Sequence, residues 1–241
     1  MSDKKTLIML ILRAICLVIF PLSYIIDPTY SGEITHFTVQ SNILILVVMV
    51  IFSLFDVLSL LGKHFEIPKL LLRLKLVATT AITVTFIVYG LILSPVLISN
   101  NLHNAVLSYS SIVMHLIIPL ISILDWIFQE TDDHFGYGNV PIALAFPLYY
   151  LVFILLTINF TNITYPTYIN GVRVDSKFPY FFLNYETNSW FKITPGESFG
   201  DWKIGVFYWL ILIGIIVTLI SFLFVLVKNL QFRYGKKNTR I

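Results

Sequence analysis

Hydrophobic residues run along this chain in long, nearly uninterrupted segments separated by short polar stretches. Six segments have the length of about 20 residues that an α-helix needs to cross a bilayer. They cover residues 7–26, 36–61, 70–93, 105–128, 141–160 and 203–227. The first is too long, and too weakly terminated by small residues, for a cleaved signal peptide. The pattern predicts an all-α integral membrane bundle of six transmembrane helices, as a single domain over residues 1–241.

The composition supports a membrane protein. Of the 241 residues, 57% are hydrophobic and only 12% are charged, against about 25% charged residues in soluble proteins. The mean hydropathy is +0.85. These values exclude a water-soluble domain.

Basic residues are distributed unevenly along the chain. They gather near the two ends and between the second and third segments, at Lys4, Lys5, Lys63, Lys69, Arg73, Lys75, Lys228, Arg233, Lys236, Lys237 and Arg240. The loops 27–35 and 94–104 contain no lysine or arginine. Because lysine and arginine favour the cytoplasmic side, both termini are predicted to be cytoplasmic. The net charge of +3 is therefore a topology signal, and we expect no nucleic-acid partner.

The loop 161–202 is predicted to face outside and is rich in aromatic residues and proline. Such a segment is not typical of a free linker. One interpretation is an aromatic belt at the level of the lipid headgroups. The other is a lid over a cavity between the helices.

Polar residues inside the spans fall on helical faces. The fourth span carries one such face, formed by Ser108, Ser111, His115, Ser122 and Asp125. Shorter faces occur in the second span, with Thr38, Ser41 and Asn42, and in the third span, with Thr79, Thr80 and Thr83. Polar faces avoid lipid. We therefore expect a polar cavity between the second, third and fourth spans, although single hydroxyls are also typical of hydrogen bonds that hold helices together.

His115 and Pro119 are the most informative residues of the fourth span. An imidazole in lipid needs partners for both nitrogens and exchanges protons near neutral pH. Pro119 lacks the backbone donor that would pair with the carbonyl of His115, so we expect the helix to open locally beside the imidazole.

Charged residues within the spans predict a second polar cluster. Arg13 and Asp56 lie at similar depths near the cytoplasmic ends of the first and second spans, and Asp125 is a competing partner for Arg13. A structural ion cluster is one interpretation, and a proton path is the alternative.

Other kinds of site find little support in the sequence. The histidines have no paired ligand spacing, so no metal is expected. No phosphate-binding GxxxxGK[ST] loop or GxSxG nucleophile motif occurs, which disfavours a nucleotide partner and common hydrolase chemistry. No cofactor is implied.

Four segments of the chain form a family pattern. They are FTVQSN at 37–42, MHLIIP at 114–119 followed by Asp125 and Trp126, PLYYL at 147–151 and FPYFFLN at 178–184. In this order, the chain resembles bacterial six-transmembrane proteins related to the androgen-induced protein and the androgen-dependent TFPI-regulating protein of animals. This resemblance favours a bacterial plasma membrane. The loop departs from the bacterial pattern at residues 180–184, where a proline and an aspartate are missing.

The resemblance implies an activity. Animal members of that family are membrane threonine hydrolases that cleave fatty acid esters of hydroxy fatty acids, which implies Thr38 as the nucleophile and His115 as the general base. The expected partners are then membrane lipids and a lipophilic ester. Oxyanion donors would come from nearby hydroxyls, Asn42 or Gln40, with Ser41 and Ser111 as further polar contacts. The alternative is a non-enzymatic protein, such as a small proton-linked carrier or a lipid-binding scaffold.

Depth along the helices tests the implied pair. Thr38 lies a few residues below the outer boundary and His115 about ten, a difference of roughly 8–12 Å. On this count Asn42 is the better neighbour of His115, unless helix tilt brings Thr38 closer.

Overall fold

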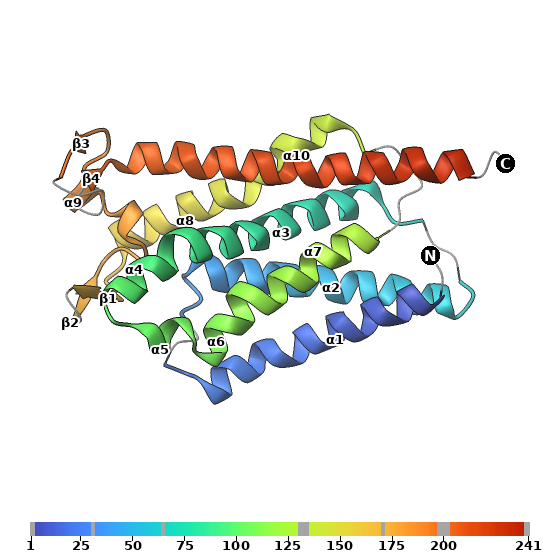
Figure 1. The fold of residues 1–241 in the computed structure, drawn as a ribbon, viewed down its shortest axis with the longest axis horizontal. Helices are drawn as coiled ribbons and strands as arrows, with labels where there is room; N and C mark the ends of the chain where they lie inside the picture. Colours follow the sequence, from blue (N-terminus) through green and yellow to red (C-terminus); the bar gives the residue numbers. More distant parts are fainter. Residues whose placement is uncertain are drawn as a thin grey trace.

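The computed structural model describes residues 3–29, 32–63, 66–129, 135–169, 172–196 and 203–238. Six long apolar helical segments lie side by side in a bundle (Figure 1), which confirms the predicted fold class. They cover Lys4–Ile26, Phe37–Leu60, Lys69–Ser99, Tyr109–Phe128, Tyr137–Phe160 and Val206–Arg233. The third segment runs six residues further than predicted, and the fourth begins four residues later.

Several of these segments change helix type along their length. The first two are α1 (Asp3–Ile26) and α2 (Phe37–Leu60). The third joins α3 (Lys69–Val88), η1 (Tyr89–Leu93) and α4 (Ser94–Ser99). After α5 (His103–Val106), the fourth joins α6 (Tyr109–Ile112), η2 (Val113–Ile117) and α7 (Ile118–Phe128). The fifth joins η3 (Tyr137–Leu144) and α8 (Ala145–Phe160), and α10 (Val206–Asn238) is the sixth.

Two π-helical turns interrupt the third and fourth segments. The turn η1 lies just before Pro95, and η2 lies just before Pro119. Proline lacks the N–H that an α-helix needs at that position, and a π-turn is one way to accommodate the loss. The predicted opening of the helix beside His115 is therefore present as η2.

The helix α3 lies at the centre of the bundle. Every residue from Lys75 to Thr85 is buried, as is typical of a helix surrounded by protein on all sides. Two clusters of buried apolar side chains meet α3 on different faces. One contains residues of α3, α7, α8 and α10, and the other contains residues of α1, α2, α3 and α7.

The chain between α8 and α10 folds at the end of the bundle opposite the two termini (Figure 1). It contains an antiparallel hairpin of β1 (Tyr165–Ile169) and β2 (Val172–Ser176), in which Tyr165 is paired with Ser176. The short elements η4 (Phe181–Leu183) and α9 (Tyr185–Asn188) follow, and β3 (Ile193–Thr194) pairs with β4 (Lys203–Ile204). We refer to the described residues 161–196 as the cap segment.

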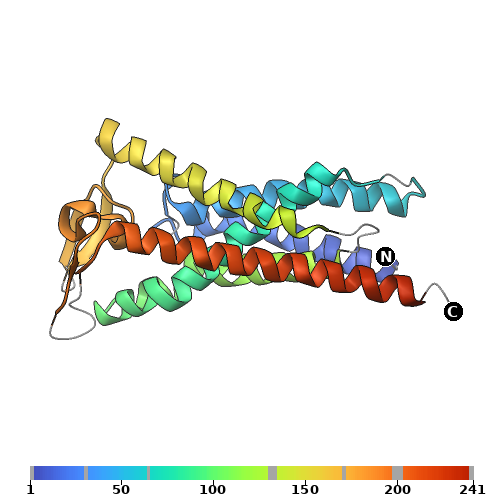
Figure 2. The same cartoon turned by 90° about the horizontal axis from the view of Figure 1, so that it is seen from above.

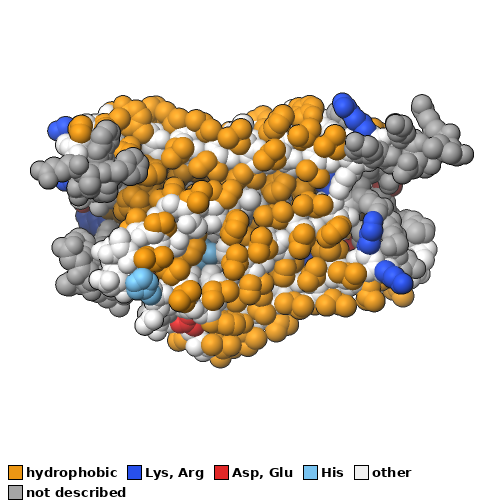
Figure 3. All heavy atoms as spheres, viewed as in Figure 1, with side chains coloured by type: hydrophobic (Ala, Val, Ile, Leu, Met, Phe, Trp, Pro, Cys, Tyr) orange, Lys and Arg blue, Asp and Glu red, His pale blue; other side chains and the backbone are white. Residues whose placement is uncertain are grey.

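The surface of the bundle suits a lipid environment. Hydrophobic side chains cover the middle of the face seen in Figure 3, and most of the visible lysine and arginine side chains lie at the ends. Many large apolar side chains on the outer faces of the helices are exposed, including Val18, Leu54 and Leu219. A soluble protein rarely exposes so extensive an apolar surface.

The cap segment is fixed to α10 at Gly205. The backbone amides of Val206 and Phe207 donate hydrogen bonds to the carbonyl oxygens of Ser189 and Trp190. A Cβ atom added at Gly205 would lie 2.6 Å from the carbonyl oxygen of Trp190. This close approach therefore requires glycine.

We expect Gly205→Ala to destabilise the protein by about 1–3 kcal/mol, because backbone atoms would have to move apart. Thermal unfolding in detergent micelles measures the effect. Gly138→Ala is the matched control, since a Cβ atom at Gly138 meets nothing within 4 Å. Equal unfolding temperatures for the two variants would contradict this view of the junction.

Candidate functional site

Thr38 and His115 meet near the end of the bundle that carries the cap segment. Thr38 is the second residue of α2, and His115 lies in the middle of the π-turn η2. The Thr38 Oγ1 atom lies 3.3 Å from His115 Nε2. This is slightly longer than an ideal hydrogen bond, and catalytic pairs are often this loose before a substrate binds.

The second nitrogen of His115 fixes the tautomer of the ring. Its Nδ1 atom lies 3.0 Å from the carbonyl oxygen of Ser111. A carbonyl oxygen only accepts hydrogen bonds, so Nδ1 carries the proton and Nε2 presents its lone pair to the Thr38 hydroxyl. The pair therefore has the arrangement that a nucleophile and its general base require, with a backbone carbonyl orienting the base.

Tyr89 holds the imidazole on its other side. The rings of Tyr89 and His115 are stacked, with 3.6 Å between centroids and 17° between planes. The Tyr89 hydroxyl is hydrogen-bonded to the hydroxyl of Ser111. Since Tyr89 begins η1 and His115 lies in η2, both π-turns contribute a ring to this contact. Such turns are frequent at functional sites.

The contact corrects the expectation drawn from depth along the helices. The fourth span begins at Tyr109, so His115 lies six residues below its start rather than about ten. Helical side chains also lean toward the N-terminus of their helix, and the imidazole reaches back one turn to Ser111. Asn42 instead donates hydrogen bonds to the carbonyl oxygens of Thr38 and Met114, at 2.8 and 3.2 Å.

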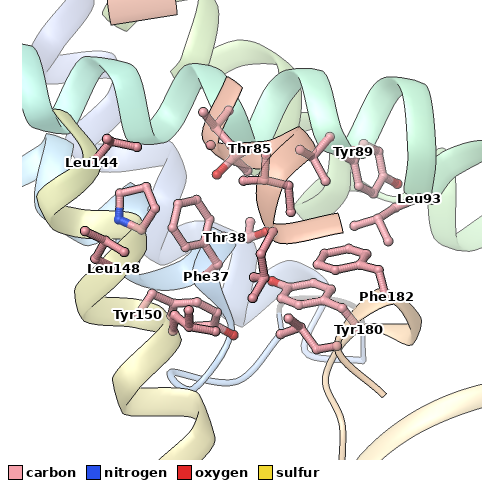
Figure 4. A pocket seen from close by; sticks show the side chains of 18 residues that line it. Phe37, Thr38, Thr85, Tyr89, Leu93, Leu144, Leu148, Tyr150, Tyr180 and Phe182 are labelled. Atoms are coloured by element: carbon pink, nitrogen blue, oxygen red, sulfur yellow. The ribbon is translucent and has the colours of Figure 1, made fainter. Parts of the chain in front are cut away.

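Thr38 lines an apolar cavity of about 140 Å³ (Figure 4). Its wall is formed by residues of α2, α3, η1, η3, α8, α10 and the cap segment. The lining residues include Thr85, Tyr89, Leu148, Tyr180 and Phe182. We predicted a cavity between the second, third and fourth spans. In the structure, the fifth and sixth spans and the cap segment line the cavity, and the fourth span does not. The ring of Tyr89 lines the cavity and stacks on His115 of the fourth span.

The cap segment covers this cavity. Tyr180, Phe182 and Leu183 all line it, and the rings of Tyr180 and Phe182 are stacked. Of the two interpretations of the aromatic loop, the lid therefore describes these residues. Trp190 and Phe191, by contrast, are exposed.

Tyr180 brings a hydroxyl group to Thr38. Figure 4 shows this hydroxyl pointing into the cavity from the cap segment. Thr38 and Tyr180 both line the cavity. Burial raises the pKa of the Tyr180 phenol, although hydrogen bonding to Thr38 and to the backbone of Phe37 acts in the opposite direction. The hydroxyl is thus protonated at neutral pH and able to donate.

The remaining residues predicted for the pocket do not line the cavity, although Ser41, Asn42 and Ser111 contact the backbone of Thr38 or the ring of His115. Ser41 donates a hydrogen bond to the carbonyl oxygen of Thr38 and contacts the hydroxyl of Thr85. Gln40 donates to the carbonyl oxygen of Ile34. The amide groups of Gln40 and Asn42 donate to backbone carbonyls, and neither residue lines the cavity.

The charged residues of the spans form a separate cluster. Arg13 contacts Asp56 at 2.7 Å and Asp125 at 2.6 Å, and Lys75 contacts Asp125 at 2.9 Å. Two cations and two carboxylates thus neutralise one another away from solvent. Asp56 is 18 residues after Thr38 on α2, which corresponds to about 27 Å. The cluster therefore lies far from the Thr38–His115 pair.

Among the described residues, no group of three His, Cys, Asp or Glu side chains is placed to hold a metal ion. His64 and His134 lie outside the described residues. Comparison with known proteins found no matching family model, no matching curated protein and no matching solved structure.

Proposed function

We propose that this multi-spanning membrane protein hydrolyses lipophilic esters, with Thr38 as the nucleophile and His115 as the general base. One observation carries the proposal: the Thr38 hydroxyl lies between Nε2 of the half-buried His115 imidazole and an apolar cavity. A hydroxyl is a weak nucleophile until an adjacent base accepts its proton. An apolar cavity inside a bilayer favours a substrate with an acyl chain.

The reaction proceeds in two acyl-transfer steps. In the first, Thr38 Oγ1 attacks the ester carbonyl carbon while its proton passes to His115 Nε2. The tetrahedral intermediate collapses, and the imidazolium gives that proton to the departing alcohol. In the second, His115 takes a proton from water as the water oxygen attacks the acyl-threonine. Collapse of this intermediate releases the fatty acid and restores the Thr38 hydroxyl.

The negative oxygen that develops in each step requires hydrogen-bond donors. Thr38 lies in the first turn of α2, where backbone N–H groups have no partner within the helix and the helix dipole favours negative charge. The Tyr180 hydroxyl points into the same cavity that Thr38 lines. We assign the oxyanion site to the Thr38 amide and the Tyr180 hydroxyl.

The resemblance of 37–42 and 114–119 to segments of the membrane threonine hydrolases supports the same two residues. It also supports membrane lipids as partners and a bacterial plasma membrane as the location. The proposal needs no cofactor, because both chemical steps use only a hydroxyl, an imidazole and water.

Turnover of a fluorogenic fatty ester by the purified protein in detergent micelles tests the proposal. We expect hydrolysis that Thr38→Ala removes and that a long-chain fatty acid inhibits. A protein that turns over no ester, or whose turnover is indifferent to Thr38, would instead favour the non-enzymatic carrier or scaffold. A proton-linked carrier needs His115 and tolerates Thr38→Ala.

Tyr180→Phe tests the assignment of the oxyanion site. We expect kcat to fall about a hundredfold, near the lower end of the effect of losing one oxyanion donor, because the Thr38 amide remains. Ester turnover measures kcat and KM separately. The control is Tyr208→Phe, since Tyr208 is an exposed residue of α10. A Tyr180→Phe variant that changes only KM would show that the hydroxyl merely contacts the bound ester.

A further inference from the structure

A shallow apolar groove follows α10 next to the cavity. It is open to the surroundings, and its walls are Leu144, Ile211, Gly214, Ile215, Thr218 and Leu219. Leu144 and Gly214 also line the cavity, so the two hollows adjoin. Figure 2 shows α8 and α10 diverging toward the end of the bundle that carries the cap segment.

The polar groups of this combined space lie at one end. Thr38, Tyr89 and Tyr180 belong to the cavity, whereas the groove is lined by aliphatic side chains apart from Thr218 and Gly214. The Thr218 hydroxyl donates a hydrogen bond to the carbonyl oxygen of Gly214 at 2.8 Å, within its own helix. The ligand that matches such a space is an amphiphile with one polar end and one apolar chain.

The length and direction of the space fit a single lipid chain. From Leu210 in the cavity to Leu219 in the groove, the wall follows nine residues of α10, which is about 14 Å. This is close to half of the roughly 30 Å hydrocarbon core. A lipid in the leaflet at the cap-segment end would therefore hold its ester near Thr38 and its chain along α10.

We propose that the cavity and the groove together bind one acyl chain of a membrane lipid, which enters sideways between α8 and α10 past Gly214. Identification of the bound ester as a substrate rests on the proposed function. The binding itself does not, because it depends on the apolar walls and not on Thr38.

Gly214 is the residue at which the passage can be closed. It lines both hollows, and a Cβ atom added there meets nothing within 4 Å. A side chain can therefore begin at this position without a clash at Cβ, and we expect a phenylalanine ring there to enter the space of the chain. Leu212→Phe is the matched control, because Leu212 is an exposed residue of α10 that lines neither hollow.

The experiment uses the full protein in phosphatidylcholine vesicles and hexadecanoic acid with a diazirine at its terminal carbon. We expect illumination to attach the probe to wild type and Leu212→Phe, at residues of α10 near Leu219, and expect Gly214→Phe to lose most of this labelling. In parallel, the turnover ratio of dodecanoate to butanoate esters should fall at least about tenfold in Gly214→Phe, as expected if the ring displaces two or more methylene groups.

The outcomes separate the two proposals. Loss of labelling in Gly214→Phe supports the acyl site even if wild type hydrolyses no ester, in which case only the proposed function fails. Labelling of Gly214→Phe at the wild-type level, or attachment spread evenly over the outer helices, would overturn the acyl site. Gly214→Leu, which adds a smaller side chain, should give an intermediate loss and guards against a folding defect in the larger variant.

Discussion

Replacement of Thr38 by alanine is expected to abolish ester hydrolysis while leaving the fold intact. The variant loses the only atom that the mechanism uses to form the acyl intermediate, and the Thr38 hydroxyl makes no contact on which a helix depends. The neighbouring Ser41 and Asn42 bonds go to the Thr38 backbone carbonyl and persist. Thr38→Ser keeps a hydroxyl and should retain measurable turnover. The thermal unfolding temperature of each variant checks that the protein is folded.

Loss of the base should have a smaller effect than loss of the nucleophile. We expect His115→Ala to lower kcat by about 10²–10⁴-fold, the range for removal of a general base. Added imidazole should restore part of the rate, because the vacated space lies between Tyr89 and Thr38. Turnover by His115→Ala at the wild-type rate would contradict the assignment of the base.

Asp125→Asn is expected to produce the largest loss of stability. The Asp125 carboxylate neutralises both Arg13 and Lys75, and the Lys75 side chain is fully buried. Without this carboxylate, one buried positive charge has no counterion. Breaking such a pair typically destabilises by about 3–5 kcal/mol. Unfolding by sodium dodecyl sulfate in mixed micelles measures the difference.

Two further variants make this result specific to charge. Asp125→Asn combined with Lys75→Met leaves Arg13 paired with Asp56, so it should recover much of the lost stability. Asp175→Asn removes an exposed carboxylate on β2 and should unfold like wild type. If Asp125→Asn also unfolds like wild type, the cluster does not stabilise the bundle.

The sequence predicts the bundle well because each span satisfies its own backbone hydrogen bonds. A run of apolar residues long enough to cross the bilayer has few alternatives to a helix. Pro119 likewise acts locally, and its effect on η2 follows from its missing N–H. The extension of the third span to Ser99 is less predictable, because Ser94 and Pro95 interrupt the apolar pattern there.

The candidate site is only partly predictable from sequence. His115 carries distinctive chemistry, whereas only the resemblance of 37–42 to the threonine hydrolases points to Thr38. The charges within the spans predict an ion cluster of Arg13, Asp56 and Asp125, and the structure contains these contacts. Tyr89 and Tyr180 were missed, since one resembles any other aromatic residue in a span and the other stands among many in the loop. Their positions depend on η1 and on the path of the cap segment over the bundle. Neither feature is encoded by periodicity.

The most direct test of the central claim is to locate the attachment site of an alkyl fluorophosphonate by tandem mass spectrometry. This reagent captures an activated hydroxyl nucleophile. We predict one adduct on Thr38 in the wild-type protein, none in Thr38→Ala and much slower formation in His115→Ala. The contradicting result is an unmodified Thr38, or an adduct elsewhere in the chain, under conditions in which a known serine hydrolase added to the same micelles reacts fully.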